Sequence, residues 1–407
     1  MTVTSESYYT WQTFQANLAD EPVRWAGKPG LEAWNELRPS QRLIADLLIG
    51  EELAPGLRVL DLRCGMGVTG ALAARRGAHV TLCDDNLVAA QAARRTLDLN
   101  GVPGQVIHGE PELGTPWQDS FDLVLLDAPR GREWVRHLLA VTAQALRPGG
   151  KLLLAGPNRG GIKGTIEDAG EIVGPCQVTR IKASCRLAVA EKRGQWSAVG
   201  PSGAVAGLQP VGCGQRAAVS GQFEASVRGQ TLRVADRPGV FAQRRGELDP
   251  GTRALIETLA AHLGEPGQAV LDLGCGCGVV GAVAARMGGL VTCVDASAAA
   301  LQVTRETLGL NGVVEQAEVI ASDCGGAVLG RRFDVVATNP PFHQGLGVEY
   351  DVARQFVRDA AHVLKPGGRL VLVANRFIRY EHMAAGLFSN VRTAYEDHRF
   401  RVLEAIK

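Results

Sequence analysis

Residues 269–278 read AVLDLGCGCG, a short apolar run that passes directly into a loop with glycine at every second position. The apolar run has the composition of a buried strand, and the loop opens an Ala- and Val-rich stretch, typical of a helix, that continues to about Met287. In a strand–loop–helix unit of this kind, the glycines let the backbone approach a ligand, and the helix N-terminus faces its anionic end. The stretch therefore predicts the first unit of a Rossmann-like fold.

The following residues continue this alternation. Residues 290–294 form a second apolar run that ends at Asp295, and Ser297 can cap a helix through about Leu308, which Asn311-Gly312 would terminate. Short apolar strands separated by helices predict a mostly parallel sheet with both faces covered.

The chain contains this domain twice. Residues 59–102 align with residues 270–313 without a gap, and 26 of the 44 positions are identical. Two further pairs of segments correspond with small shifts, 121–124 with 333–336 and 146–150 with 364–368. We therefore expect two tandem Rossmann-like α/β domains with doubly wound, mostly parallel sheets.

The composition between the two copies changes to Gly, Ala, Ser, Pro and Gln. It predicts a first domain over residues 1–193, a linker over 194–221 and a second domain over 222–407. Within the second domain, residues 223–227 and 231–234 flank Arg228-Gly229-Gln230 and are typical of a hairpin.

The composition of the whole chain is that of an ordinary globular protein. Its 407 residues carry a formal net charge of +1, with 46% hydrophobic and 21% charged residues. This balance excludes a globally basic nucleic-acid coat, so any contact with RNA must be a local patch. The nine cysteines include no CxxC pair, which favours reduced thiols and no metal site. No signal peptide or membrane span is indicated, so we expect a cytoplasmic protein with no membrane partner.

The glycine loop has the spacing D-x-G-x-G-x-G, with Asp272 at its head, and Asp295 follows 23 residues later. A lone glycine loop is also compatible with a dinucleotide enzyme, but that class uses G-x-G-x-x-G. An acid at the head suits a ligand with an ammonium as well as a carboxylate, and an acid at the end of the next strand can bind a ribose.

A second motif, Asn339-Pro340-Pro341-Phe342, closes the apolar run 333–338. The Asn side-chain carbonyl and a proline-stiffened backbone carbonyl can hold a planar amino group, and an aromatic face can stack on the ring that carries it. The motif therefore indicates methyl transfer to a conjugated nitrogen.

These motifs resemble those of class I S-adenosylmethionine-dependent methyltransferases with an Asn-Pro-Pro-[Phe/Tyr] signature. Together with the duplication, the chain is similar to the bacterial ribosomal RNA guanine-N2 methyltransferases, especially the small-subunit (16S) enzymes. The segments that carry this similarity are PGVF (238–241) with Asp249, NPPFH (339–343), VANRF (373–377) and RFRVL (399–403).

The resemblance implies S-adenosyl-L-methionine as the cofactor. Gly274, Gly276 and Gly278 would line its methionyl part with Asp272 nearby, and Asp295 would bind the ribose. Asp323 would contact the adenine amine, although a turn or helix-cap Asp is the structural alternative.

The resemblance also implies the catalytic residues Asn339, Pro340 and Phe342. The Asn339 oxygen and the Pro340 carbonyl would accept the two protons of the guanine N2 amine, and Phe342 would stack on a flipped-out guanine. The expected substrate-binding residues are Phe241, Pro341, His343, Asn375 and Arg376. The structural alternative is core packing for Phe241, a hydrogen bond that shapes the loop for His343, and a solvated charged loop for Asn375 and Arg376.

The first copy has lost these features. Arg63 stands at the position of Gly274, Asp127 at that of Asn339 and Arg130 at that of Phe342. We expect a catalytically silent domain that serves packing and RNA recognition, although Asp84, the counterpart of Asp295, is retained and leaves cofactor binding there open.

The sequence therefore favours an enzyme that methylates a guanine N2 in ribosomal RNA, either free or in a ribosomal subunit. Alternatives that use the same loop are a 23S rRNA guanine-N2 enzyme and a protein glutamine-N5 or DNA adenine-N6 methyltransferase. A non-catalytic RNA-binding assembly factor is the alternative outside enzymes. Because the duplication can supply what a dimer would, we expect a monomer.

Overall fold

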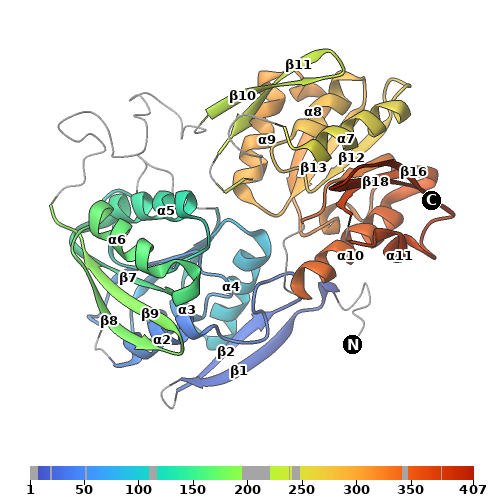
Figure 1. Cartoon of the computed structure of the whole chain (residues 1–407). Helices are drawn as coiled ribbons and strands as arrows, with labels where there is room; N and C mark the ends of the chain where they lie inside the picture. Colours follow the sequence, from blue (N-terminus) through green and yellow to red (C-terminus); the bar gives the residue numbers. More distant parts are fainter. Residues whose placement is uncertain are drawn as a thin grey trace. The chain divides into compact units, whose positions relative to one another are not determined.

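The computed structural model (Figure 1) describes residues 8–18, 21–50, 53–109, 117–194, 221–237, 239–240, 248–341, 347–376 and 378–407. The chain divides into two compact units. One comprises Trp11–Ala218, and the other comprises Val219–Lys407 together with Met1–Thr10, of which residues 8–10 are described. The association of an N-terminal segment with the C-terminal unit was not predicted from the sequence.

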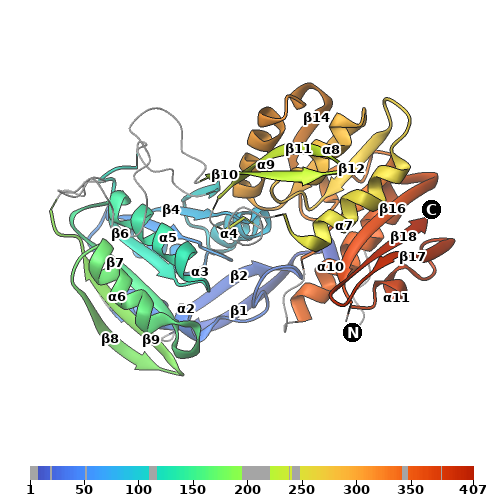
Figure 2. The same cartoon turned by 45° about the horizontal axis from the view of Figure 1, so that its top comes forward.

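The C-terminal unit is built on a seven-stranded sheet with the order β14-β13-β12-β15-β16-β18-β17. Its first five strands are parallel, and β18 is antiparallel to both β16 and β17. Figure 2 shows β16, β18 and β17 side by side. The strands are β12 (Ala269–Leu273), β13 (Leu290–Asp295), β14 (Ala317–Ala321), β15 (Phe333–Thr338), β16 (Leu364–Asn375), β17 (Asn390–Glu396) and β18 (Phe400–Ile406).

Helices cover both faces of this sheet. Alternate side chains of each strand point to opposite faces and pack in two different hydrophobic cores. Val270 packs with α7 (Pro250–Leu259), α8 (Val279–Arg286) and α9 (Ala298–Leu310). Its neighbour Leu271 packs with α10 (Gly347–Val363) and α11 (Tyr380–Ala384) on the other face. Short 3-10 turns are η2 (Ala260–His262), η3 (Val314–Gln316) and η4 (Gly326–Val328).

The expected hairpin is present as β10 (Gly221–Val227) and β11 (Gln230–Asp236), which form a separate two-stranded sheet. The predicted helix after the glycine loop is also confirmed, as is the N-cap, where the Ser297 hydroxyl accepts a hydrogen bond from the Ala300 N–H. Most of the predicted linker, residues 195–220, lies outside the described residues.

The N-terminal unit repeats this architecture with the sheet order β5-β4-β3-β6-β7-β9-β8 and a β1-β2 hairpin. The prediction of two tandem Rossmann-like domains is therefore confirmed. Its elements are β1 (Gln12–Leu18), β2 (Glu21–Gly27), α2 (Pro39–Gly50), β3 (Arg58–Leu62), α3 (Val68–Arg75), β4 (His79–Asp84), α4 (Leu87–Asn100), β5 (Gln105–His108), β6 (Phe121–Asp127), α5 (Arg132–Ala145), β7 (Leu146–Pro157), η1 (Asn158–Gly160), α6 (Ile162–Ile172), β8 (Cys176–Lys182) and β9 (Cys185–Glu191).

The described parts of the chain contain neither a membrane-spanning helix nor a cluster of metal-ligating side chains. No helix there is long and apolar enough to cross a membrane. Within the same residues, no group of three or more His, Cys, Asp or Glu side chains could hold a metal ion.

Candidate active site

The predicted motifs of the C-terminal unit lie at one edge of its sheet. They follow the carboxyl ends of parallel strands, where ligands of open α/β sheets bind. Leu273 pairs with Thr338, so the glycine loop after β12 and Asn339 after β15 begin side by side. The Thr338 hydroxyl donates a 2.7 Å hydrogen bond to the Leu273 carbonyl oxygen and fastens the two strand ends together.

The glycine loop depends on left-handed backbone conformations. Gly274, Gly276 and Gly278 have φ angles of 78°, 53° and 77°, which side chains other than glycine rarely adopt. The loop is held by Asp295, whose Oδ2 accepts a 3.0 Å hydrogen bond from the Gly276 N–H. The other oxygen of Asp295 accepts from the Ser297 N–H at 2.9 Å, which orients the carboxylate at the end of β13.

Asp272 supports the loop from beneath. Its side chain is buried, and Oδ2 accepts a 2.9 Å hydrogen bond from the Gly281 N–H in the first turns of α8. Burial raises the pKa of Asp272 to about 7, against the Gly281 hydrogen bond, and the neighbouring charge of Asp295 adds to the rise. The carboxyl therefore ties strand to helix beneath the predicted cofactor loop.

Asn339 has an oriented side chain. Its Nδ2 donates a 3.1 Å hydrogen bond to the Thr252 hydroxyl oxygen in α7. Its Oδ1 is buried and has no hydrogen-bond partner among the residues that the structure describes. A buried amide oxygen without a partner is costly, so the site is ready to accept a donor from a ligand.

Thr252 is itself fixed by Asp249, the N-cap of α7. Asp249 Oδ2 accepts hydrogen bonds from the Thr252 N–H at 2.9 Å and from the Thr252 hydroxyl at 3.3 Å. Both Thr252 and Asp249 are buried. Asp249 belongs to the segments that carry the family resemblance, whereas no sequence signal pointed to Thr252.

Asp323 follows β14 at the same edge and meets the N-terminal segment. The Tyr8 hydroxyl donates a 3.0 Å hydrogen bond to Asp323 Oδ1. The Tyr9 hydroxyl donates its single proton to the buried carboxylate of Asp359 in α10 at 2.6 Å, and its oxygen lies 3.3 Å from the Asp323 carbonyl oxygen. No sequence pattern pointed to these contacts, because they join residues more than 300 positions apart.

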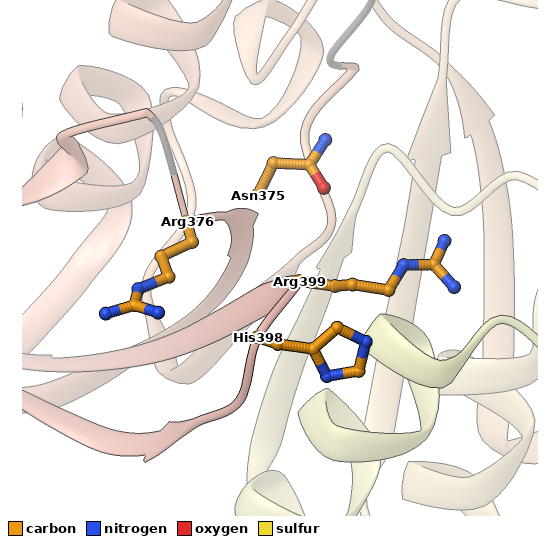
Figure 3. Close-up of a pocket in the computed structure, with 4 residues that line it drawn as sticks. All are labelled: Asn375, Arg376, His398 and Arg399. Atoms are coloured by element: carbon orange, nitrogen blue, oxygen red, sulfur yellow. The ribbon is translucent and has the colours of Figure 1, made fainter.

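A pocket of about 480 Å³ opens beside the ends of β16 and β18 and is lined by Asn375, Arg376, His398 and Arg399 (Figure 3). The Arg376 and Arg399 side chains extend to opposite sides of Asn375, and the His398 ring lies beside Arg399. Arg376 pairs with Glu396 at 2.8 Å. The Arg399 guanidinium lies 5.1 Å from the centre of the Phe400 ring and has no ion-pair partner in the described parts of the chain.

Phe400, which follows the pocket residue Arg399 in the sequence, lies near Asp249. A methyl group on Gly251 would lie 2.9 Å from Phe400 Cδ1 and from Asp249 Oδ2, so the ring and the carboxylate both abut the α7 N-terminus. The predicted residues Asn375 and Arg376 are thus brought to the same side of the unit as Asn339, and His398 and Arg399 join them.

The remaining predicted residues are placed in part. Pro340 is buried and Pro341 is exposed. Phe241, Phe342 and His343 lie outside the described residues, so their predicted roles stay predictions.

The N-terminal unit keeps the loop geometry without the glycine. Arg63 has a φ of 57°, the left-handed conformation that Gly274 adopts in the other repeat. The supporting bonds are also retained, because Gly70 N–H donates to Asp61 at 2.7 Å and Gly65 N–H donates to Asp84 at 2.9 Å. The two loops therefore share their backbone conformation, and they differ in the Arg63 side chain that replaces the glycine.

Asp127 is paired with a cation. Its Oδ2 lies 2.7 Å from the Arg38 Nη2, and Arg38 precedes α2 at the same offset of 211 residues that relates the two glycine loops. Arg38 therefore stands where the other repeat has Asp249. Burial raises the pKa of Asp127 even though Arg38 opposes the rise. The N-terminal unit thus has the Arg38–Asp127 ion pair at the position where the C-terminal unit has the unpaired Oδ1 of Asn339 within its described residues.

Comparison with known proteins agrees with this architecture. The family model described as "Methyltransferase small domain" matches residues 24–181 and again residues 231–404, one match for each repeat.

Several curated relatives carry one name, ribosomal RNA small subunit methyltransferase C. The protein of that name from Chromohalobacter salexigens is 37% identical over 276 residues, covering 68% of this chain and 74% of the relative. That from Alcanivorax borkumensis is 34% identical over 291 residues, covering 70% and 80%.

Among solved structures, the T. thermophilus 16S rRNA N2 G1207 methyltransferase, in complex with AdoMet and guanosine, matches with a TM-score of 0.78. It is 30% identical, and the match covers 99% of this chain and 100% of that one.

Proposed function

The chain belongs to the methyltransferase small domain family and is similar to proteins named ribosomal RNA small subunit methyltransferase C, and from this premise we propose its reaction. It transfers a methyl group from S-adenosyl-L-methionine to the exocyclic N2 amine of a guanine in 16S ribosomal RNA. The names of the relatives and the bound molecules of the T. thermophilus structure support this assignment over the 23S, protein glutamine and DNA adenine alternatives.

The observation that carries the proposal is the buried Oδ1 of Asn339. It has no partner within the described residues and sits next to the glycine loop at the carboxyl edge of the sheet. A guanine N2 amine offers two protons, so Asn339 Oδ1 and the Pro340 carbonyl oxygen can each accept one. Two such acceptors orient the nitrogen and favour its tetrahedral form, because its lone pair is then less delocalised into the ring.

The residues present fit the cofactor. The left-handed glycines allow close approach to the loop backbone, and the fixed carboxylate of Asp295 suits the ribose hydroxyls. Asp323 would contact the adenine amine, and Asp272 would hold the loop from beneath. When bound, S-adenosyl-L-methionine supplies an electrophilic methyl group on a sulfonium.

Asn339 would act by orienting the amine and by stabilising the positive charge that develops on it. The nitrogen becomes cationic as the bond forms, so its proton can leave afterwards and no strong base is required. Phe342 would stack on the guanine, with Phe241, Pro341 and His343 shaping the pocket around it.

The pocket of Asn375, Arg376, His398 and Arg399 would bind the RNA beside the target base. Phosphate groups are bound by Arg guanidinium and by amide or imidazole donors, and this pocket offers all three. It adjoins Asp249 through Phe400, so a nucleotide held there would be a neighbour of the base at Asn339.

The N-terminal repeat would be catalytically silent and would serve packing and RNA recognition. We propose residues 1–193 as the silent repeat and 222–407 as the catalytic one, with the exception of residues 8–10, which pack with the catalytic unit. The protein would act as a monomer in the cytoplasm, without a metal, on ribosomal RNA or an assembled small subunit.

The test is to incubate the full chain with labelled S-adenosyl-L-methionine and either 16S rRNA or small subunits from cells that lack the enzyme. The RNA is then digested in one sample to nucleosides, which identifies the methylated base, and in another to oligonucleotides, which locates it; both are analysed by mass spectrometry. We expect one methyl group per RNA, in N2-methylguanosine at the counterpart of G1207. Label in any other nucleoside, or only in 23S rRNA or protein, would refute the assignment.

A further inference from the structure

Three side chains, Asp249, Thr252 and Asn339, form a directional hydrogen-bond chain at the sheet edge. Asp249 Oδ2 accepts both the Thr252 N–H at 2.9 Å and the Thr252 hydroxyl at 3.3 Å. The Thr252 hydroxyl oxygen accepts the Asn339 Nδ2–H at 3.1 Å. All three groups lie in the C-terminal unit, and two of them are held on α7.

A hydroxyl has a single proton to donate. Because Asp249 Oδ2 already accepts the Thr252 N–H, it acts as an acceptor and attracts that hydroxyl proton. Toward Asn339, the hydroxyl can therefore only accept, and only the amide NH₂ of Asn339 can satisfy it. A flipped amide would place two oxygens in contact with no proton between them.

We propose that Thr252, oriented by Asp249, is a positioning residue that fixes the side-chain amide of Asn339 with its oxygen facing the substrate. The inference rests on the proposed function of Asn339 and names the residues that make that function possible. Without the Thr252 hydroxyl, the Asn339 amide could rotate and turn its NH₂ group toward the substrate. That group would repel the guanine amine, whereas the amide oxygen accepts a proton from it.

The other repeat supports this interpretation. The counterparts of Asp249, Thr252 and Asn339 are Arg38, Gln41 and Asp127. There the cation contacts the carboxylate directly at 2.7 Å, and the Gln41 Oε1 accepts from the Arg38 backbone N–H at 3.1 Å instead of bonding to Asp127. All three members of the hydrogen-bond chain, the Asn included, are therefore replaced in this repeat.

The test compares Thr252→Val, which keeps the shape and removes the hydroxyl, with Thr252→Ser, which keeps the hydroxyl. We expect Thr252→Val to lower kcat about tenfold with the KM for cofactor unchanged, and Thr252→Ser to remain within about twofold of wild type. If Thr252→Val does not fold, Thr252→Ala serves in its place, since it cannot crowd the site.

A double-mutant cycle separates positioning from a structural role. If Thr252 acts only through Asn339, the double variant Asn339→Ala with Thr252→Val will be no slower than Asn339→Ala alone. Full activity of a folded Thr252→Val, or losses that multiply in the double variant, would overturn the proposal. An inactive wild type would instead count against the proposed function.

The orientation of the Asn339 amide can also be measured without substrate, which tests the proposal even if the wild type is inactive. In protein labelled with ¹⁵N-asparagine, the Asn339 side-chain signals are assigned by their loss in Asn339→Ala. We expect their protons to exchange with water more slowly in wild type and Thr252→Ser than in Thr252→Val. Equal rates of amide-proton exchange in all three proteins would refute the hydrogen-bond chain, even if no methyl transfer were found.

Discussion

The Arg38 Nη2 atom lies 2.7 Å from Asp127 Oδ2, so the N-terminal repeat holds an ion pair where the C-terminal repeat presents an amide oxygen. An ionic contact of this kind engages the acceptor that a substrate amine would need. The two repeats share their fold and their glycine-loop backbone, and they differ at the atoms that would meet the substrate.

The first prediction concerns Arg63→Gly. This change restores the glycine of the loop but leaves the rest of the first repeat unchanged, including the Arg38–Asp127 ion pair that stands where the other repeat has Asp249 and Asn339. We expect calorimetry to give one equivalent of S-adenosyl-L-methionine for both wild type and variant. Two equivalents for Arg63→Gly would mean that the N-terminal repeat is closer to a working site than we infer.

A second prediction concerns the pocket of Asn375, Arg376, His398 and Arg399. Arg399→Ala should raise the KM for RNA and reduce the slope of log affinity against log salt by about 1, because one phosphate contact is lost. Cofactor affinity should stay unchanged. Arg331→Ala is the matched control, since Arg331 precedes β15 at the other edge of the sheet and pairs with Glu318. Equal effects of the two variants on RNA binding would show that the pocket does not contact the RNA.

The third prediction concerns pH. Burial raises the pKa of Asp272 to about 7, so the folded state retains a proton that the unfolded chain has released. The stabilisation is fully present below the unfolded pKa and is lost as the pH rises through the folded one. Relative to Asp272→Asn, wild type should lose about 2–3 kcal/mol of unfolding free energy between pH 5 and pH 7.

Denaturant unfolding at the two pH values checks this, with exposed Asp98→Asn as the control. Asp61→Asn should behave like Asp272→Asn, because burial also raises the pKa of Asp61 to about 7. A difference that does not change with pH would show that Asp272 is ionised throughout.

A fourth prediction concerns the N-terminal segment. Tyr9→Phe removes the 2.6 Å hydrogen bond to the buried Asp359 carboxylate and should lower the unfolding free energy by about 1–3 kcal/mol. Tyr395→Phe is the control, because Tyr395 is exposed and donates to Asp397 at 3.1 Å on the surface. Equal unfolding free energies of the two variants would show that the Tyr9 hydrogen bond does not stabilise the C-terminal unit.

Much of the fold could be predicted because its signals are local. The run AVLDLGCGCG, the cap at Ser297 and the repeat at a constant offset each specify an element or its partner within a short window. The alignment of the two repeats also extends toward the N-terminus at the same offset, where it pairs Arg38 with Asp249 and shows that a cation replaces this carboxylate.

The contacts that could not be predicted are those between distant segments. Tyr8 meets Asp323 across 315 positions, and no periodicity or spacing encodes that pairing. Thr252 reads in the sequence as an ordinary residue in the first turn of a helix, and only the packing of α7 against β15 shows that it bonds to Asn339.

The central claim is that the C-terminal repeat alone performs the reaction, and one matched pair of variants tests it most directly. Asn339→Ala and Asp127→Ala are assayed under single-turnover conditions with labelled S-adenosyl-L-methionine and small subunits, after calorimetry has verified that both bind the cofactor. We predict that Asn339→Ala loses at least about 100-fold in rate, the scale of one lost transition-state hydrogen bond, while Asp127→Ala stays within about threefold of wild type. Near-normal transfer by Asn339→Ala, or its loss in a folded Asp127→Ala, would contradict the account.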